Sequence, residues 1–359
     1  MNASQEFRLS GIAIPKDASE MLGEICEHFV EHADVHRTEN KATLTSKLGS
    51  AEIRIEDRQL SIELRCPSQQ ALQLSQTSLA EHLFYFAGDE PFELTWSQTA
   101  RLARLPNIHE VTVVSCEDVT PHMRRVKFAC ADVGPFIGGE MHVRLLVPPK
   151  GRLPIWPGQR EDGRVAWPEG DDTLLVRAYT IRAVDAERGE LWIDFLQHPS
   201  PGVATPGADF ARDTQPGDKV ALLGPGGGAL PLATNLLLIG DESALPAIAR
   251  IVAEVPEGTQ IQAIIEVENQ EEEQPLPSRA SLDVLWLHRQ TYFSDHSKRL
   301  RDEAHAAIAA MPSNTFVWVA CEKEDIRSIK ASLKTLQHDK KKMYAAWYWT
   351  RKPGGSTDG

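Results

Sequence analysis

The sequence predicts a multidomain α+β and α/β protein in three parts: a small α+β domain over residues 1–97, an antiparallel six-stranded barrel over 108–228 and a parallel-sheet α/β domain over 231–355. Three observations predict this division. The chain has 359 residues, which is more than one ordinary core organises. Between residues 108 and 228 the pattern is β throughout, and after Pro231 apolar strands alternate with helices.

In the first part, two helical patterns flank a set of alternating strands. Residues 18–31 repeat apolar side chains at helical spacing, among them Met21, Ile25 and Phe29. Strands are expected at residues 41–48, 50–56, 59–65 and 92–96, and a second helix at 68–86. Residues 98–107 are expected to form a linker, because polar and Pro residues cluster where few contacts cross.

The second part shows six β patterns separated by turn-rich joints. They cover residues 110–116, 123–129, 141–147, 173–181, 190–196 and 219–223. No convincing long helix interrupts them, which favours an antiparallel barrel.

The third part alternates strands and helices. Strands are expected at residues 235–240, 260–267, 282–287, 315–320 and 343–349, and helices at 243–254, 295–310 and 325–337. Because these strands are apolar enough to be buried on both faces, they predict a parallel sheet, an architecture typical of nucleotide-binding domains.

Composition limits the classes of function. No apolar run approaches the ~18 residues of a membrane span, and the first ten residues lack the pattern of a signal peptide, so we expect a cytoplasmic protein without a membrane partner. The formal charge of −13 disfavours nucleic acid, and residues 271–273, all Glu, are expected in a solvated loop. The five cysteines form no Cys-x-x-Cys pair, which disfavours disulfide, zinc and iron–sulfur sites, so no metal site is predicted. We expect a monomer.

The most informative motif is the run Arg177-Ala178-Tyr179-Thr180-Ile181-Arg182 on a predicted strand. Alternate side chains of a strand point the same way, so Arg177 and Tyr179 share one face and Thr180 lies on the other. A flavin needs an aromatic face, a donor near its redox-active nitrogen and a guanidinium for its pyrophosphate. The motif offers all three, although an ordinary strand with a surface Arg and a half-buried Tyr fits the same four residues.

Further segments follow this motif in order. They are the loop 198–205, Pro216-Gly217-Asp218 leading to Gly224-Pro225-Gly226-Gly227, the segment 238–248, the segment 317–322 and Tyr348-Trp349. With these segments, the chain from about residue 108 to 355 resembles the siderophore-interacting protein family, flavin-dependent ferric-siderophore reductases with a ferredoxin-reductase-like layout. Residues 1–97 resemble a small uncharacterised domain fused to such reductases, through the segment 81–86 and Trp96. The resemblance implies no role for that domain.

The resemblance implies FAD as cofactor. Arg177 would bind its pyrophosphate, Tyr179 would stack on its isoalloxazine, and Thr180 would lie near its redox-active nitrogen. Arg182 would either join them or form a surface ion pair. The phosphate loop would comprise His198, Gly202, Val203, Ala204 and Thr205, with backbone N–H groups as donors; a plain turn is the alternative. His142 either approaches the flavin or is a satisfied barrel histidine.

NADPH or NADH would bind at the carboxyl ends of the parallel strands. The predicted contacts are Asp241, Glu242, Ser243, Ala244, Glu322 and Trp349, and Ser243 alternatively caps its helix. Glu266 at the adenosine ribose would favour NADH, whereas Arg279, His288 and Arg289 would favour the 2′-phosphate of NADPH. The residues leave this open, and the resemblance tilts toward NADPH.

Two positions depart from the family pattern. Cys321 replaces a glycine and lies either beside the nicotinamide or inert in the core. Thr350 stands where an arginine is usual, with Arg351 next.

The resemblance implies that a hydride passes from NAD(P)H to FAD and that single electrons then reduce siderophore-bound Fe(III) to Fe(II), which frees the iron. Basic candidates for the anionic siderophore are Arg124, Arg125, Lys127, Arg351 and Lys352, each of which is otherwise an ordinary surface charge. A general flavin or quinone reductase, a non-catalytic ferric-siderophore binding protein, and an N-terminal module that recruits a partner remain alternatives.

Overall fold

The computed structural model describes residues 6–30, 33–98, 104–197, 205–291, 299–351 and 357–358. The chain divides into two compact units. One comprises residues 1–108 with 149–173, and the other comprises 109–148 with 174–359. Among the described residues, no helix is both long and apolar enough to span a bilayer.

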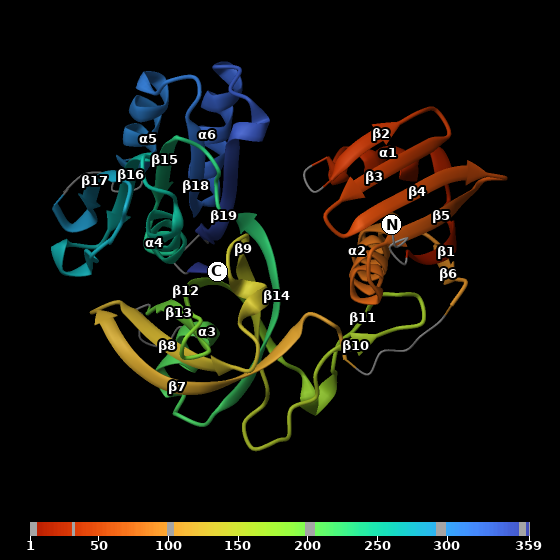
Figure 1. Ribbon diagram of the computed structural model, residues 1–359, viewed down its shortest axis with the longest axis horizontal. Helices are drawn as coiled ribbons and strands as arrows, with labels where there is room; N and C mark the ends of the chain where they lie inside the picture. The colour runs from red at the N-terminus through yellow and green to blue at the C-terminus, as the bar shows by residue number, and fades with distance from the viewer. Residues whose placement is uncertain are drawn as a thin grey trace, which may run out of the picture. The chain divides into compact units, whose positions relative to one another are not determined.

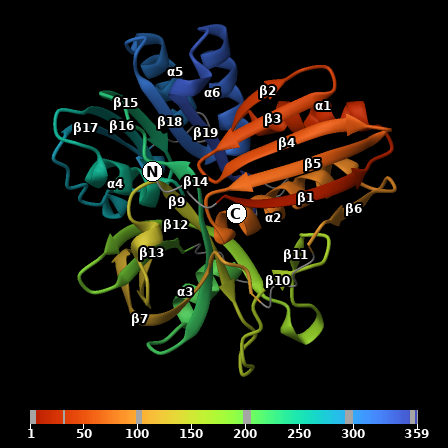
Figure 2. The ribbon, with the colours of Figure 1, turned by 45° about the vertical axis from the view of Figure 1, so that its right-hand side comes forward.

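The first unit is a six-stranded antiparallel sheet with two helices on one face (Figure 2). Its strands lie in the order β2-β3-β4-β5-β1-β6. Their bounds are Phe7–Ile14 (β1), Asp34–Arg37 (β2), Lys41–Ser46 (β3), Gly49–Glu56 (β4), Gln59–Cys66 (β5) and Glu93–Trp96 (β6), and the helices are Ala18–Phe29 (α1) and Gln69–Ala87 (α2). Asp17 caps α1 by accepting the N–H groups of Ser19 and Glu20. Strands β1 and β2 were not predicted from the sequence.

A segment that follows the barrel strand Glu140–Val147 (β9) in sequence packs within this first unit. Residues 149–173 contain the short strands Gly158–Gln159 (β10) and Val165–Ala166 (β11), which pair with each other. The indole Nε1 of Trp96 donates to the carbonyl of Asp162 at 2.9 Å. The buried amide of Gln159 donates to Thr77 Oγ1 at 2.9 Å. The range 108–228 predicted for the barrel therefore includes a segment that belongs by its contacts to the N-terminal unit.

The second unit begins with a closed barrel in the strand order β12-β13-β8-β7-β14-β9. The strands are Ile108–Thr120 (β7), Met123–Cys130 (β8), Glu140–Val147 (β9), Leu175–Asp185 (β12), Glu190–Leu196 (β13) and Lys219–Ala229 (β14), joined by the helices Gly134–Phe136 (η1), Gly170–Asp172 (η2, in the first unit) and Pro206–Asp213 (α3). Their inward residues form one apolar core around Phe128 and Phe195. The predicted antiparallel six-stranded barrel is confirmed.

The remainder is an α/β sheet in the order β17-β16-β15-β18-β19-β20, parallel except at β20. The strands are Asn235–Gly240 (β15), Gln260–Val267 (β16), Ser281–His288 (β17), Phe316–Glu322 (β18), Met343–Arg351 (β19) and Thr357–Asp358 (β20), and the helices are Leu245–Glu254 (α4), Gln270–Glu272 (η3), Arg289–Thr291 (η4), Arg299–Ala310 (α5), Lys323–Thr335 (α6) and Lys340–Lys342 (η5). Helix α4 packs in the core on one face of the sheet, and α5 and α6 pack in the core on the other (Figure 1). The predicted parallel α/β architecture is confirmed.

Two buried side chains join the barrel to the α/β sheet. Arg250 of α4 donates from Nη1 to the carbonyl of Ile181 at 3.0 Å and from Nη2 to the carbonyl of Phe136 at 2.7 Å. Glu272 accepts from Thr120 Oγ1 at 2.6 Å and is 3% exposed. The expectation that all of residues 271–273 lie in solvent is therefore wrong for Glu272, whose carboxylate has a barrel hydroxyl as partner.

Candidate functional site

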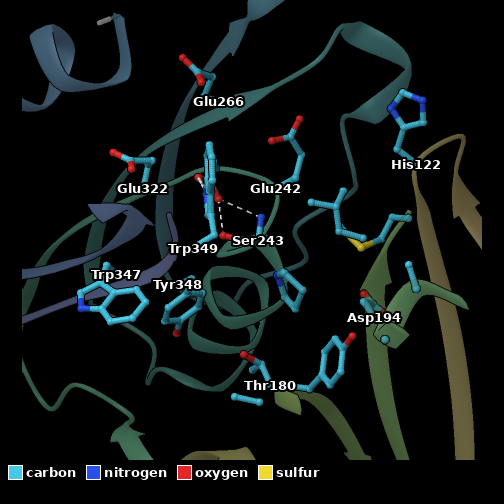
Figure 3. Close-up of a pocket in the computed structure, with 18 of the residues that line it drawn as sticks. His122, Thr180, Asp194, Glu242, Ser243, Glu266, Glu322, Trp347, Tyr348 and Trp349 are labelled. Atoms are coloured by element: carbon cyan, nitrogen blue, oxygen red, sulfur yellow. Dashed lines mark hydrogen bonds between the residues drawn. The ribbon is translucent and has the colours of Figure 1, made fainter. Parts of the chain in front are cut away.

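One cavity of about 1380 Å³ lies between the barrel and the α/β sheet of the second unit. Barrel strands β12 and β9 supply one wall, and the carboxyl ends of β15, β16, β18 and β19 supply the other (Figure 3). Predicted residues that line it are Arg177, Tyr179, Thr180, Thr205, Asp241, Glu242, Ser243, Glu322, Trp349 and Arg351. Residues 198–204, and with them His198, Gly202, Val203 and Ala204, lie outside the described part of the chain, as does Lys352.

The Tyr179 ring is held between the barrel core and α3. It packs on Phe195 with ring centroids 4.3 Å apart. At Gly207 in the first turn of α3, an added Cβ would lie 1.8 Å from Tyr179 Oη, so only a glycine leaves room for the phenol. Burial raises the pKa of Tyr179, which keeps its hydroxyl protonated.

Residues suited to a pyrophosphate line the same side of the cavity. Arg177 belongs to β12, and its Nη1 donates to the carbonyl of Val176 at 2.8 Å. Helix α3 begins directly after Thr205, so the N–H groups of Gly207 and Ala208 are in its first turn, where intrahelical acceptors are absent. An arginine, a helix N-terminus and a Cβ-free position beside an aromatic ring fit the pyrophosphate and ring system of FAD.

Thr180 and His142 are register partners on β12 and β9, and both line the cavity. Thr180 Oγ1 lies 3.2 Å from His142 Nδ1, and Tyr348 Oη lies 3.0 Å from His142 Nε2. Burial, with a smaller effect of Arg250, lowers the pKa of His142 to about 4. His142 thus has a hydrogen-bonding partner at both ring nitrogens and also lines the cavity. A satisfied barrel histidine and a residue near the predicted flavin site were offered as alternatives, and the structure is compatible with both.

At the carboxyl end of β15, Asp241 organises its neighbours. Trp349 Nε1 donates to Asp241 Oδ2 at 2.7 Å, and the backbone N–H of Ser243 donates to Asp241 Oδ1 at 2.9 Å. The Ser243 hydroxyl also bonds to Asp241, and the N-cap position of α4 is Ala244, without a side-chain bond. Ser243 therefore does not cap its helix, and the buried Ala244 does not line the cavity.

Arg289 stands among acidic side chains at the next strand end. Its Nη1 donates to Glu242 at 2.9 Å and to Glu266 at 3.3 Å, and Nη2 donates to Glu268 at 3.4 Å. Burial raises the pKa of Glu266 to about 7, although Arg289 opposes this shift. The other two cations proposed for a 2′-phosphate lie elsewhere: His288 bonds to Glu273, and Arg279 is exposed outside the cavity lining.

The two departures from the family pattern lie near Glu322. Glu322 caps α6 by accepting the N–H of Glu324 at 2.6 Å and also accepts the N–H of Arg351 at 3.2 Å. Cys321 is buried in the core with α5 and α6, and the cavity lining does not include it, which favours the inert alternative. Thr350 pairs with Asp358 in the β19–β20 ladder.

Three of the basic residues proposed for an anionic substrate are already paired with carboxylates, one of which, Asp194, lines the cavity. Arg125 forms a two-bond contact with Asp194, at 2.7 and 2.8 Å. Arg182 also lies 3.8 Å from Asp194, but both side chains are largely buried, so this is not the surface ion pair offered as its alternative. Arg124 pairs with Asp118, and Lys127 pairs with Glu117. Of the five substrate candidates, only Arg351 lines the cavity among the described residues.

Three family models match successive parts of the chain. A model described as "Siderophore-interacting FAD-binding domain" matches residues 112–229, and "Siderophore-interacting protein" matches residues 233–352. A third, "Uncharacterized protein conserved in bacteria (DUF2218)", matches residues 13–97. These matches confirm the predicted family and its FAD-binding barrel.

Similar proteins have related names. The ferric vibriobactin reductase ViuB of Vibrio cholerae is 30% identical over 58% of this chain and 76% of its own length. The mycobactin import ATP-binding/permease protein IrtA of Mycolicibacterium thermoresistibile is 29% identical over 67% of this chain, which spans only 25% of that protein. The crystal structure of the siderophore-interacting protein SipS from Aeromonas hydrophila matches with a TM-score of 0.55 and 26% identity, over 70% of this chain and 93% of that one.

Proposed function

This chain belongs to the siderophore-interacting protein family, and we propose that it is an FAD-dependent reductase that transfers electrons from NAD(P)H to the iron of a ferric siderophore. The observation that carries the proposal is that one cavity places the Arg177–Thr180 strand opposite the carboxyl ends of a parallel sheet. A flavin site and a nicotinamide site must meet for hydride transfer. This cavity borders the residues suited to each.

The cavity is large enough for more than one ligand. Its volume of about 1380 Å³ exceeds the roughly 300–1,000 Å³ of a typical small-molecule site. Bound FAD would supply the step between a two-electron donor and a one-electron acceptor. Arg177 and the first turn of α3 would hold its pyrophosphate, and Tyr179 would support its ring.

The opposite wall would position the nicotinamide nucleotide. Ligands of open α/β sheets bind at the carboxyl ends of the strands, where Asp241, Ser243 and Trp349 form one hydrogen-bonded group. A reductase that depends on NAD(P)H would work where that reductant is maintained, so we assign the reaction to the cytoplasm.

The ferric siderophore is the substrate, and it would approach the exposed edge of the site. Among the arginines that line the described part of the cavity, Arg177 is assigned to pyrophosphate and Arg289 is surrounded by carboxylates, which leaves Arg351 for an anionic iron complex. Fe(II) binds catecholate and hydroxamate oxygens weakly, so reduction releases the metal without protein ligands. Among the described residues, no group of three or more His, Cys, Asp or Glu side chains is placed to hold a metal ion.

Flavin content and electron transfer test the proposal separately. The purified protein should absorb near ~450 nm as flavoproteins do, and Arg177→Ala or Tyr179→Ala should weaken FAD retention. Under anaerobic conditions NADPH or NADH should bleach the flavin, and a ferric siderophore should reoxidise it with Fe(II) trapped by a ferrous chelator.

The alternatives give different results. A protein that cannot be reconstituted with FAD is not a reductase of this type and would have to act, if at all, as a binding protein. A flavin that quinones reoxidise but ferric siderophores do not would identify a general reductase instead.

A further inference from the structure

A chain of hydrogen-bonding side chains crosses the cavity wall from the barrel to the α/β sheet. It runs from Thr180 Oγ1 to His142 Nδ1 at 3.2 Å, and from His142 Nε2 to Tyr348 Oη at 3.0 Å. Tyr344 Oη also lies 3.3 Å from His142 Nε2. The histidine thus connects the threonine predicted to face the flavin with two tyrosines of β19.

Two glycines of β14 lie close to His142. At Gly228, where φ is +58°, an added Cβ would lie 2.3 Å from His142 Nε2 and 2.6 Å from Cδ2. At Gly224, where φ is +144°, an added Cβ would lie 3.2 Å from the carbonyl oxygen of His142. The glycine-rich end of β14 therefore leaves the imidazole the space it occupies, and any larger residue at 228 would push it away from the tyrosines.

The protonation states of the histidine and the tyrosines determine which atom donates in each of these hydrogen bonds. With a pKa near 4, His142 is neutral at neutral pH and has one N–H and one acceptor nitrogen. Burial raises the pKa of Tyr348 and Tyr344, so both phenols remain protonated donors. A phenol that donates to Nε2 places the imidazole hydrogen on Nδ1, where it is donated to Thr180 Oγ1. The Thr180 hydroxyl then accepts from His142, and its own hydrogen can be donated to the neighbouring Tyr348, with which Thr180 also interacts, or to a bound ligand.

We propose that His142 is a positioning residue that orients the Thr180 hydroxyl as a donor to the redox-active nitrogen of the flavin, with Tyr348 fixing the imidazole tautomer. This inference rests on the proposed function. In the reaction that it serves, bound FAD would accept a hydride from NAD(P)H, which would be oxidised as the flavin is reduced. His142 and Thr180 transfer no proton in this step.

The tautomer is measurable without any turnover. Nitrogen-15 NMR of histidine-labelled, FAD-free protein distinguishes an Nδ1–H from an Nε2–H imidazole, and the signal lost in His142→Gln assigns the residue. We expect the Nδ1–H form in the wild-type protein and a mixture in Tyr348→Phe. An Nε2–H form in the wild-type protein would overturn the inference.

Single-turnover flavin reduction tests the coupling. Thr180→Val and His142→Phe should each slow bleaching at saturating donor by about tenfold to a hundredfold, up to the loss expected when a reacting group is misplaced. The double variant should be no slower than Thr180→Val alone, because both changes remove the same interaction. The affinity for FAD, measured by flavin fluorescence, should change by less than about threefold.

Two variants keep the test decisive if His142→Phe fails to fold. Tyr348→Phe removes one hydroxyl, and its slower bleaching should also vanish in a Thr180→Val background. His109→Phe changes a barrel histidine that contacts Phe136 outside the cavity lining and should bleach at the wild-type rate. If the effects of the His142 and Thr180 variants on the bleaching rate add, or if FAD affinity falls while the bleaching rate is unchanged, the role of His142 is only structural. A wild-type protein that binds no FAD would instead refute the proposed function.

Discussion

Replacing Arg250 with methionine should loosen the α/β sheet from the barrel. Arg250 is 1% exposed, and its two Nη atoms donate to the carbonyls of Ile181 and Phe136. Its Nε bonds to Glu254 one turn away in α4. Methionine fills much of the same volume but donates nothing, so two buried carbonyls would lose their partners.

The cost follows from these contacts. A hydrogen bond to a charged group contributes about 1.5–3 kcal/mol, and removal of a buried charge recovers part of its desolvation cost. We therefore expect a net loss of about 3 kcal/mol in the free energy of unfolding. For a unit of this size, that corresponds to a fall of about 6–12 °C in its melting temperature.

Thermal denaturation followed by tryptophan fluorescence, with and without FAD, checks this value. Glu254→Gln is the matched control, because that side chain is 32% exposed and its amide oxygen can still accept from Arg250 Nε, so it should cost less than the loss of both carbonyl bonds. Arg250→Lys should lose most of the stability too, since an ammonium cannot reproduce the planar fork. The reasoning fails if Arg250→Met melts within about 2 °C of Glu254→Gln.

Three further outcomes are expected. Gly207→Ala should weaken FAD binding at least about tenfold in a fluorescence titration, because its Cβ would overlap Tyr179. Gly226→Ala, with open space around its Cβ, should leave the affinity for FAD unchanged. Equal affinities of the two variants for FAD would contradict a flavin site at Tyr179 and Gly207. Glu266→Gln should raise kcat/KM for NADPH relative to NADH by about threefold or more at pH 8, because it removes a negative charge that would repel the 2′-phosphate. The effect should be smaller at pH 6, where a carboxyl with a pKa of about 7 is already mostly neutral. An unchanged ratio at pH 8 would place the 2′-phosphate elsewhere. Burial lowers the pKa of His142 from 6.5 to about 4, so the unfolded chain binds the proton at a higher pH than the folded protein does, and about 3 kcal/mol of the free energy of unfolding should be lost as the pH falls from 6.5 to 4. Urea titrations across this pH range should show a smaller loss of stability in His142→Gln. The same dependence of stability on pH in both proteins would contradict the lowered pKa of His142.

Local periodicity predicted most of the fold because each element carries its own signal. Alternating apolar residues located all six barrel strands, and continuous apolar runs located β15 and β16. Strand β1 was missed because two of its three buried positions are small: Gly11 and Ala13 lie on the inner face with Leu9, and an added Cβ at Gly11 would lie 2.6 Å from Trp96. Small residues leave little hydrophobic pattern even where they are tightly packed.

The site was only partly predictable, because its parts come from distant segments. A linear motif suffices for Arg177 and Tyr179, which lie two residues apart on one strand. The contacts of Arg289 depend on three strand ends meeting, and those of Glu272 depend on a partner about 150 residues earlier in the chain. From charge alone, Arg289 was a candidate for binding phosphate and Glu272 was expected in solvent. Their partners from distant parts of the sequence instead place Arg289 among carboxylates and bury Glu272.

Residues 149–173 make the N-terminal unit discontinuous in sequence. The segment leaves β9 and returns to β12, the paired strands that carry His142 and Thr180. Its own contacts are with Trp96 and α2, through Asp162 and Gln159. A cut at residue 97 would therefore expose the face of this segment that packs on Trp96 and α2. Loss of activity after such a cut would not by itself assign a catalytic role to the N-terminal domain, whereas retained activity would exclude one.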